Sequence, residues 1–307
     1  MMERFDHFMA RANAAYYSTQ DPFKNFTTAP ELTQVFGEIL GAWAKTVWQM
    51  MGAPDNVILA EAGPGRGTLM ADALRLWPRE QVHLIETSPR LRAEQAIRVP
   101  NAIWHESLDT IPDGPLILLA NEFLDALPVR QFVRRESGWC ELYVEDGAYV
   151  ELPADIELPD DPLGSSREIN EPALTFCRKL AARDAVALFL DYGPAQSAPG
   201  SSVQAIRDGA YSDPLQDPGQ ADLTAHVDFA AIAAAVENVQ GPVKQNAFLT
   251  GLGLFQRSDF LARKFPDKAR DFALAAQRLT APEAMGSLFK AMALCPKHLP
   301  RLPGFEI

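Results

Sequence analysis

Three glycines that follow a short apolar run are the first candidates for chemistry. Gly63, Gly65 and Gly67 come directly after residues 57–61 (Val-Ile-Leu-Ala-Glu) and precede a helix-compatible stretch over residues 69–77. Glycine at such a point lets the backbone turn tightly and approach a ligand closely, and the following helix N-terminus offers free N–H groups. The pattern predicts a loop that cradles a nucleoside-containing ligand. The alternative is a tight turn with no ligand.

Two acidic residues beside this loop indicate the charge of the ligand. Glu61 immediately precedes the loop, and Glu86 ends the next apolar run, 86 − 63 = 23 positions beyond the first glycine. An acid at the second position can accept hydrogen bonds from both ribose hydroxyls. The G-x-G-x-G spacing departs from the G-x-G-x-x-G dinucleotide fingerprint, and an acid at position 61 opposes a pyrophosphate but suits a cation. Because S-adenosylmethionine carries an ammonium and a sulfonium, the charges favour it over NAD.

Another candidate segment follows the apolar run 116–120 and begins with Asn121 and Glu122. In an open parallel sheet, ligands bind outside the carboxyl ends of the strands, so we expect this segment to flank the same crevice as the glycine loop. Glu122 and Asp125 are three positions apart and share a face if the segment is helical. Two carboxylates beside a methyl donor can orient a guanidinium in bidentate fashion. The alternative is that they only cap a following helix.

His226 lies in a further candidate segment, residues 222–229. Histidine titrates near neutral pH, so His226 is a candidate base or orienting residue. The alternative is a helix start, in which Thr224 or Asp228 caps an Ala-rich helix over 227–236. The other histidines have no ligand spacing to one another, so no metal site is predicted; they are His7, His83, His105 and His298.

The period of the apolar residues predicts the elements that position these segments. Residues 3–17 have helical spacing, and so does a stretch that starts with Thr28 as a plausible N-cap and runs to Trp43. Four short apolar runs suit strands that are buried on both faces of a parallel sheet, and these are 57–61, 82–86, 116–120 and 187–191. Helix-compatible stretches between several of them predict a doubly wound α/β fold.

The remaining stretches predict smaller features. Residues 131–133 and 139–144 read as a hairpin, and 286–294 as a late strand. Residues 151–171, rich in Pro, Asp and Ser, read as a surface excursion.

Composition bounds the class of protein. The 307 residues include 28 Lys+Arg and 40 Asp+Glu, for a net charge of −12, and 47% are hydrophobic, which predicts a soluble globular protein of one large or two modest domains. The acidic balance argues against general affinity for nucleic acid or anionic membranes. Three scattered cysteines predict a reducing compartment. The first residues lack the apolar stretch of a signal peptide, and no apolar run approaches the roughly 20 residues that span a bilayer.

In this order, the segments resemble the MidA-like family of S-adenosylmethionine-dependent methyltransferases, which includes the mitochondrial complex I assembly arginine methyltransferase. The most specific matches are 121–128 (Asn-Glu-Phe-Leu-Asp-Ala-Leu-Pro) and 221–229 (Ala-Asp-Leu-Thr-Ala-His-Val-Asp-Phe). The other matching stretches are 15–17, 21–23, 26–31, 36–38, 61–70, 86–89, 191–193 and 285–290, so that nearly the whole chain is covered.

The resemblance implies a Rossmann-like sheet of seven mostly parallel strands, S-adenosylmethionine as cofactor, and transfer of a methyl group to an arginine of a protein. The three glycines would hold the methionine part of the cofactor, Glu86 the ribose, and residues 104–107 would border the adenine. The expected cofactor-binding residues are Glu61, Gly63, Gly65, Gly67, Glu86, Ser107, Leu108 and Asn121, and the expected catalytic residues are Glu122, Asp125 and His226.

We expect an N-terminal helical lid segment over 1–50 and a methyltransferase domain over 51–307, with insertions around 129–185 and 194–225. The expected partners are a protein substrate, which by resemblance is a respiratory-complex subunit, and a second copy of the chain in a homodimer. No nucleic acid and no membrane insertion are expected. The expected location is the bacterial cytoplasm, or the mitochondrial matrix in a eukaryote, and no presequence is expected.

The chain departs from the family pattern in two loops. Only Lys24-Asn25 stands where the family has a glycine-rich stretch, and Asp208-Gly209 stands near an expected histidine. Cofactor binding therefore carries over better than substrate choice. Two other functions fit the same fold: a nicotinamide-dependent oxidoreductase, and a cofactor-binding assembly factor without catalysis.

Overall fold

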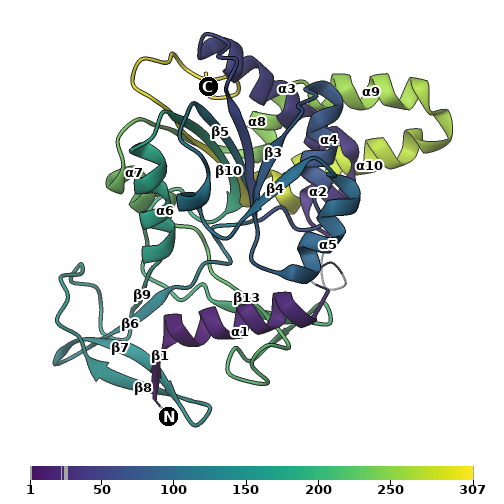
Figure 1. Ribbon diagram of the computed structural model, residues 1–307. Helices are drawn as coiled ribbons and strands as arrows, with labels where there is room; N and C mark the ends of the chain where they lie inside the picture. Colours follow the sequence, from purple (N-terminus) through teal and green to yellow (C-terminus); the bar gives the residue numbers. More distant parts are fainter. Residues whose placement is uncertain (1, 22, 24–26, 307) are drawn as a thin grey trace. The chain divides into compact units, whose positions relative to one another are not determined.

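Figure 1 shows the computed structural model of the chain, which describes residues 2–21, 23 and 27–306. The chain forms two compact units, each made of segments that are separate in sequence. Unit 1 combines residues 1–26, 124–175 and 194–232, and unit 2 combines 27–123, 176–193 and 233–307. Lys24 and Asn25, at one of the departures from the family pattern, lie outside the described residues.

Unit 2 is built on a seven-stranded sheet. Its strands, from one edge to the other, are β14 (Val239–Lys244), β15 (Phe289–Leu294), β10 (Ala185–Tyr192), β5 (Leu116–Asn121), β2 (Ile58–Ala62), β3 (Val82–Ile85) and β4 (Ala102–His105). Neighbours are parallel from β10 to β4, whereas β15 is antiparallel to both β10 and β14. The predicted Rossmann-like α/β fold with seven mostly parallel strands is confirmed.

The central strands are buried along their whole length, as continuous apolar runs predict for a sheet covered on both faces. Helices α3 (Gln34–Met50), α4 (Thr68–Leu76) and α5 (Pro89–Arg98) belong to this unit. The first two pack so closely that a Cβ on Gly37 would lie 2.8 Å from the backbone oxygen of Leu69. Glycine at this position therefore lets α3 approach α4, the helix that follows the glycine loop.

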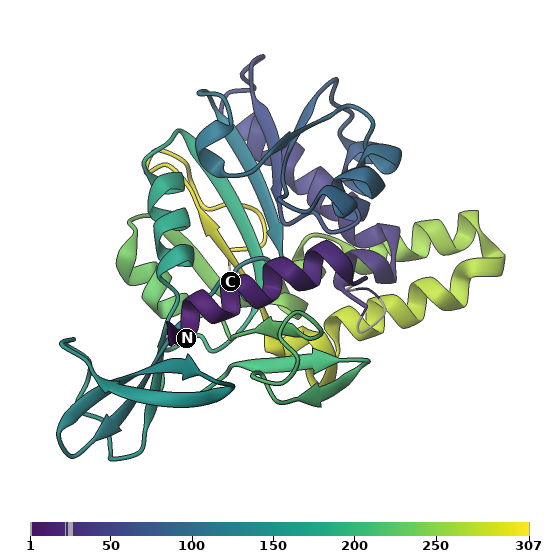
Figure 2. The same cartoon turned by 60° about the horizontal axis from the view of Figure 1, so that its bottom comes forward.

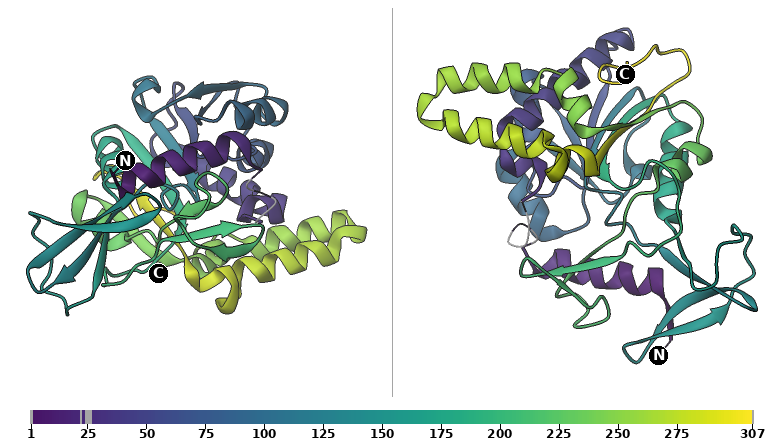
Figure 3. Two further views of the ribbon diagram at one scale, coloured as in Figure 1. Left: turned by 90° about the horizontal axis from the view of Figure 1, so that it is seen from below. Right: turned by 180° about the vertical axis from the view of Figure 1, so that it is seen from behind.

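Three helices lie between β14 and β15 in the sequence: α8 (Gln245–Gly251), α9 (Leu254–Lys264) and α10 (Ala269–Thr280). Figure 3 shows α9 and α10 as two helices that run side by side. No structure is predicted from the sequence for this stretch. In α9, the buried residues recur at helical spacing, and this spacing is the sequence pattern that indicates a helix; they are Leu254, Ser258 and Leu261.

Unit 1 contains two antiparallel sheets. One has the order β1 (Glu3–Arg4), β7 (Gly138–Glu145), β6 (Arg130–Arg135) and β9 (Ser166–Ile169), with β8 (Ala148–Pro153) paired to β7; the other has the order β12 (Ala210–Ser212), β11 (Gln204–Arg207) and β13 (Asp222–Thr224). Helix α1 (Phe5–Thr19) lies along β13 (Figure 2), where the Asn13 side chain bonds both the N–H and the carbonyl of Leu223. The division between the units falls inside two helices, α6 (Glu171–Ala181) and α7 (Phe229–Ala235).

Several local expectations are confirmed and others are wrong. The hairpin is confirmed as β6 and β7, with Phe132 opposite Glu141. The helix expected from Thr28 to Trp43 is broken into α2 (Ala29–Leu32) and α3, because Thr33 is extended and caps the second piece through Val35 N–H. Thr28 makes no side-chain cap. The excursion at 151–171 includes β9, which pairs with β6.

Among the described residues, no helix is both long enough and apolar enough to cross a bilayer.

Candidate active site

The glycine loop connects β2 to α4 and turns through left-handed backbone conformations. The φ angles of Gly63, Gly65 and Gly67 are 63°, 52° and 80°, a region in which a side chain on an L-residue is strained. The loop is closed by two backbone hydrogen bonds, from Gly63 N to Ile85 O at 3.1 Å and from Gly67 N to Pro64 O at 2.7 Å. All three glycines are therefore required by the turn, whether or not a ligand is bound.

Glu61, on β2 just before the loop, is an ionisable group in an apolar setting. It is buried, and a hydrogen bond from the Met70 N–H favours its charged form. Burial raises the pKa of this carboxyl from its ordinary value of 4.5 to about 8. Its Oε2 atom has no hydrogen-bond partner within the described residues. A neutral, incompletely bonded carboxyl fits a cationic ligand, whose approach would favour ionisation.

This burial leads to a prediction for the chain without cofactor. Between pH about 4.5 and about 8 the unfolded chain loses the Glu61 proton while the folded chain keeps it, so this group makes stability fall as pH rises. Glu61→Gln stays neutral and keeps an acceptor for Met70 N–H. We expect it to raise the free energy of unfolding at pH 7 by about 3 kcal/mol and to flatten the pH dependence. Urea unfolding at pH 5, 7 and 8 measures both, and parallel pH profiles for the two proteins would contradict the prediction.

Glu86 lies at the carboxyl end of β3. Its Oε1 accepts a hydrogen bond from Ser88 N at 2.8 Å, and its Oε2 accepts one from Gln95 Nε2 at 3.3 Å. Burial raises the pKa of the carboxyl, and these donors oppose that change. The side chain is thus held in one orientation beside the glycine loop, as a ribose-binding acid requires.

Gln95, on α5, is a residue that the sequence analysis missed. It is fully buried, and it contacts the glycine loop, Glu86 and Trp104 through hydrogen bonds. No motif marks it, because a glutamine in a helix with many polar residues reads as solvent-exposed. Its contacts become visible only in three dimensions.

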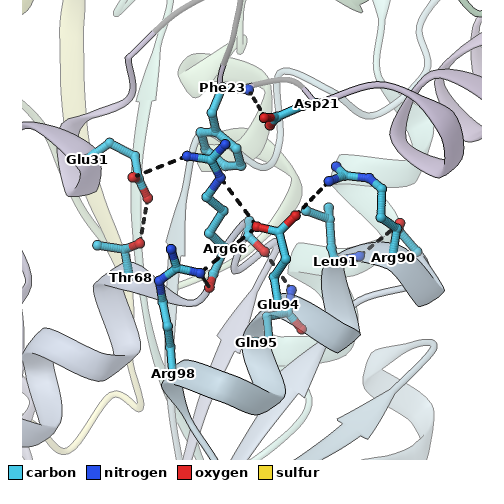
Figure 4. A network of polar contacts seen from close by, with 12 residues as sticks. Asp21, Phe23, Glu31, Arg66, Thr68, Arg90, Leu91, Glu94, Gln95 and Arg98 are labelled. Carbon is cyan, nitrogen blue, oxygen red and sulfur yellow. Dashed lines mark hydrogen bonds and ion pairs between the residues drawn. The ribbon is translucent and has the colours of Figure 1, made fainter.

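Charged residues form a network around Arg66 of the glycine loop (Figure 4). The guanidinium of Arg66 lies between Glu94, with Nε 3.4 Å from Oε2, and Glu31, with Nη1 4.0 Å from Oε2. Thr68 donates to Glu31 Oε1 at 2.5 Å, and Arg90 donates to Glu94 Oε1 at 2.7 Å. Single exposed ion pairs contribute little, but this network joins α2, the loop and α5.

Asn121 is the last residue of β5 and Glu122 follows it, at the same edge of the sheet as the glycine loop. Glu122 has φ +50°, unusual for a residue with a side chain. Its N–H donates to Leu190 O at 2.9 Å, and its Oε1 accepts from Asn121 Nδ2 at 3.1 Å and from Ala29 N at 3.4 Å. The next peptide is held by Asp191, whose Oδ2 accepts from Phe123 N at 3.2 Å. Strain of this kind is typical of functional sites.

The turn after β5 and the glycine loop touch directly. A Cβ on Gly63 would lie 2.9 Å from Cδ2 of the Phe123 ring. The buried Oδ1 of Asn121 has no hydrogen-bond partner within the described part of the chain. The structure therefore brings Glu61, Asn121 and Glu122 to one edge of the sheet with the loop.

Ser107 and Leu108 follow β4, the strand beyond β3. Ser107 Oγ accepts from Asp109 N at 3.3 Å and caps a single 3₁₀ turn, in which Leu108 is buried. The preceding strand is held to β3 by His105 and His83, with Nε2 and Nδ1 2.8 Å apart, and burial lowers the pKa of both rings. Ser107 and Leu108 thus lie at the carboxyl end of the edge strand β4, as a contact to adenine requires.

The other two catalytic candidates belong to unit 1. Asp125 is buried and its carbonyl accepts from Ala225 N at 2.9 Å, but it caps no helix, because a turn and not a helix follows it. The segment is not helical, so the condition for a shared helix face with Glu122 is not met.

His226 is exposed, and its N–H donates to Ser202 Oγ at 2.8 Å. Asp228 caps the Ala-rich helix through Ala231 N at 2.8 Å, as one alternative predicted, whereas Thr224 ends β13.

Tyr17, which is half-buried, and Asp222, which is buried, form a hydrogen-bonded pair in the same unit. The tyrosine hydroxyl donates to Asp222 Oδ1 at 2.7 Å, and burial raises the pKa of Asp222 to about 6 and that of Tyr17 well above its ordinary value. The charge of Asp125 adds to the increase for Tyr17. Both residues lie in stretches that resemble the family, but no role is predicted for either of them from the sequence.

The strand order of unit 2, with a glycine loop after β2 and an acid after β3, defines a Rossmann-like fold of the nucleoside-binding type. A family model described as "Putative S-adenosyl-L-methionine-dependent methyltransferase" matches residues 39–247. The chain belongs to this family, so it is an S-adenosylmethionine-dependent methyltransferase.

Individual relatives cover most of the chain. The mitochondrial protein arginine methyltransferase NDUFAF7 homolog of Drosophila melanogaster is 30% identical, over 96% of this chain and 82% of that protein. The human protein arginine methyltransferase NDUFAF7, mitochondrial, is 31% identical over 91% and 75%. A crystal structure of a Burkholderia thailandensis protein bound to S-adenosyl-homocysteine is similar with a TM-score of 0.83 and 26% identity, over 99% of this chain and 90% of that one.

Proposed function

We propose that this protein transfers a methyl group from S-adenosylmethionine to an arginine of a protein substrate. The observation that carries the proposal is Glu122, a carboxylate held in a left-handed conformation on the turn that contacts the glycine loop. A guanidinium is a planar cation with five N–H donors, and a carboxylate is its matched partner. The names of the relatives in fly and human support the same acceptor.

The cofactor site that we propose lies within unit 2. The loop of Gly63, Gly65 and Gly67 holds the methionine part, and the Glu61 carboxyl below it balances the positive charge. Glu86 accepts hydrogen bonds from the ribose, and residues 107–108 border the adenine. Two buried oxygens without partners in the described residues, Glu61 Oε2 and Asn121 Oδ1, support this placement, because each is left ready to accept a bond from a ligand.

Glu122 acts on the acceptor by positioning it. S-adenosylmethionine supplies an electrophilic methyl carbon when bound. The guanidinium nitrogen forms a bond to that carbon as the sulfur–carbon bond breaks, which leaves S-adenosylhomocysteine, and the methylated nitrogen gives up one proton. Glu122 accepts N–H bonds from the guanidinium and turns one nitrogen toward the methyl group, so the acceleration comes from orientation. Asp125 and His226 remain proposed catalytic residues of unit 1, the first as a second carboxylate and the second as a base.

A binding measurement tests the cofactor against the oxidoreductase alternative. We expect calorimetric titration to give saturable heat with S-adenosylhomocysteine and none with NAD. The loop has one residue between its second and third glycines where a dinucleotide fingerprint has two, and Glu61 opposes a pyrophosphate. Tighter binding of NAD would contradict the prediction.

The acceptor is tested by transfer of label. The purified protein is incubated with S-adenosylmethionine labelled in its methyl group and a lysate of the organism, and the labelled residue is identified by mass spectrometry. Methylated arginine on a protein supports the proposal, and label on a small molecule or on lysine overturns the arginine assignment. Four further points stay predictions: a respiratory-complex subunit as acceptor, the homodimer, the lid over 1–50 and the compartment.

A further inference from the structure

Gln95 makes three hydrogen bonds, one to each part of the proposed cofactor site. Its Nε2 donates to Gly65 O at 2.7 Å and to Glu86 Oε2 at 3.3 Å, and its Oε1 accepts from Trp104 Nε1 at 2.8 Å. The side chain is fully buried. One amide thus connects three parts of the proposed site: the glycine loop, the proposed ribose-binding Glu86, and the strand that precedes the adenine region.

The orientation of this amide is determined by its partners. A backbone carbonyl and a carboxylate only accept hydrogen bonds, whereas the indole N–H only donates. The reversed amide would face two acceptors with its oxygen and the Trp104 donor with its NH₂ group. One orientation therefore satisfies all three contacts, and the other satisfies none.

The amide orientation has consequences for two groups. The carbonyl of Gly65 and the N–H of Arg66 belong to one trans peptide plane and point in opposite directions, so holding the carbonyl toward Gln95 directs that N–H away from it. Glu86 Oε2 is held by Gln95 while Oε1 is held by Ser88 N–H, so the carboxylate plane is fixed by a donor on each oxygen.

We propose that Gln95 is a positioning residue for the cofactor: it orients the Glu86 carboxylate toward the ribose hydroxyls and the Gly65 peptide toward the ligand. Trp104 acts one step further away, because its indole N–H selects the amide orientation. The inference rests on the proposed cofactor site and deepens it. It places in the binding chemistry a glutamine that never needs to touch the cofactor.

A comparison of two ligands separates positioning from a purely structural role. The ligands are S-adenosylhomocysteine and its 2′-deoxy analogue, and the dissociation constants of both are measured by calorimetry. In the unaltered protein we expect loss of the hydroxyl to weaken binding about 10- to 100-fold, the range for a hydrogen bond to a charged group. Gln95→Met keeps the length of the side chain but has no donors, and we expect it to bring the two ligands within about threefold of one another.

The ratio of the two dissociation constants, more than either constant by itself, separates positioning from a structural role. A side chain that only maintains the fold would weaken both ligands equally and leave the ratio unchanged, and that result would overturn the proposal. Ile97→Ala serves as the matched control, because Ile97 is on the same helix and is 82% exposed. We expect this control to keep the full ratio.

A second variant keeps the test decisive if Gln95→Met does not fold. Trp104→Phe preserves an aromatic ring and removes the N–H that selects the amide orientation, so we expect a ratio between those of the unaltered protein and Gln95→Met. An unchanged ratio in Trp104→Phe would overturn the role of the amide orientation. If the unaltered protein binds neither ligand, the proposed cofactor site itself is wrong, and this result is distinct from a retained ratio in a protein that binds both.

Discussion

Replacing Glu122 by glutamine is expected to lower methyl transfer by about 10²-fold or more while the affinity for S-adenosylhomocysteine stays unchanged. Glutamine keeps the length of the side chain and an oxygen for the bonds from Asn121 Nδ2 and Ala29 N, so the turn after β5 is preserved. What is lost is the negative charge that pairs with a guanidinium and presents one of its nitrogens. Misplacing a reacting group by a small distance is known to cost this much in rate.

The measurement is single-turnover transfer of label at saturating cofactor, together with calorimetry of S-adenosylhomocysteine. Glu80→Gln is the matched control, because it makes the same chemical change at an exposed residue that precedes β3, at the opposite ends of the strands. We expect this control to retain full activity. Weakened cofactor binding with normal turnover at saturation in Glu122→Gln would move the residue to the cofactor site and remove the main support for an arginine acceptor.

The sheet and its loop were predictable because their signals are local. A run such as 116–120 is apolar at every position, and a strand buried on both faces has no other pattern to show. Gly63, Gly65 and Gly67 turn the chain through conformations that other residues avoid, so their place between a strand and a helix is written in the sequence. β2, β3, β5 and β10 consequently fall within two residues of the predicted runs.

The turn at Glu122 was not predictable in the same way. Its spacing to Asp125 suits a helix, and the left-handed conformation that replaces the helix depends on partners far away in sequence. Glu122 N–H is held by Leu190 O, and the following N–H by Asp191 on β10. A local pattern carries no information about such contacts, so tertiary structure overrode the helical spacing.

Buried polar residues follow the same rule. The sequence around Glu38 on α3 does not distinguish it from an exposed helical residue, yet Glu38 is buried. Its two oxygens accept hydrogen bonds, one from Gln34 on the same helix and one from Arg257, which is 219 positions away in the sequence. Gln95 is buried for a comparable reason, since Gly65, Glu86 and Trp104 satisfy its amide. Polar residues are predicted to be exposed, and Glu38 and Gln95 are exceptions because each has at least one partner on another element.

Gly65→Val is expected to abolish measurable binding of S-adenosylhomocysteine in a protein that still folds. Gly65 has φ +52°, and valine is branched at Cβ, so it is strained there by about 1 to 2 kcal/mol or more. The chain relieves this strain by moving the loop out of the left-handed turn. That movement would break the bond from Gln95 Nε2 to Gly65 O and displace the loop N–H groups that we propose to face the ligand. A branched side chain would also occupy space that the backbone leaves for the cofactor.

Gly52→Val separates the loss of the site from the loss of stability. Gly52 has φ +87° and would have no atom within 4 Å of an added Cβ, so valine there carries comparable backbone strain without a neighbour to displace. It lies after α3 and outside the glycine loop. Thermal unfolding followed by circular dichroism should show both variants folded and both somewhat destabilised, while calorimetry should show cofactor binding in Gly52→Val alone. If Gly65→Val is folded and binds as tightly as this control, then Gly65 does not line the cofactor site, and the loop is only the tight turn that its three positive φ angles require.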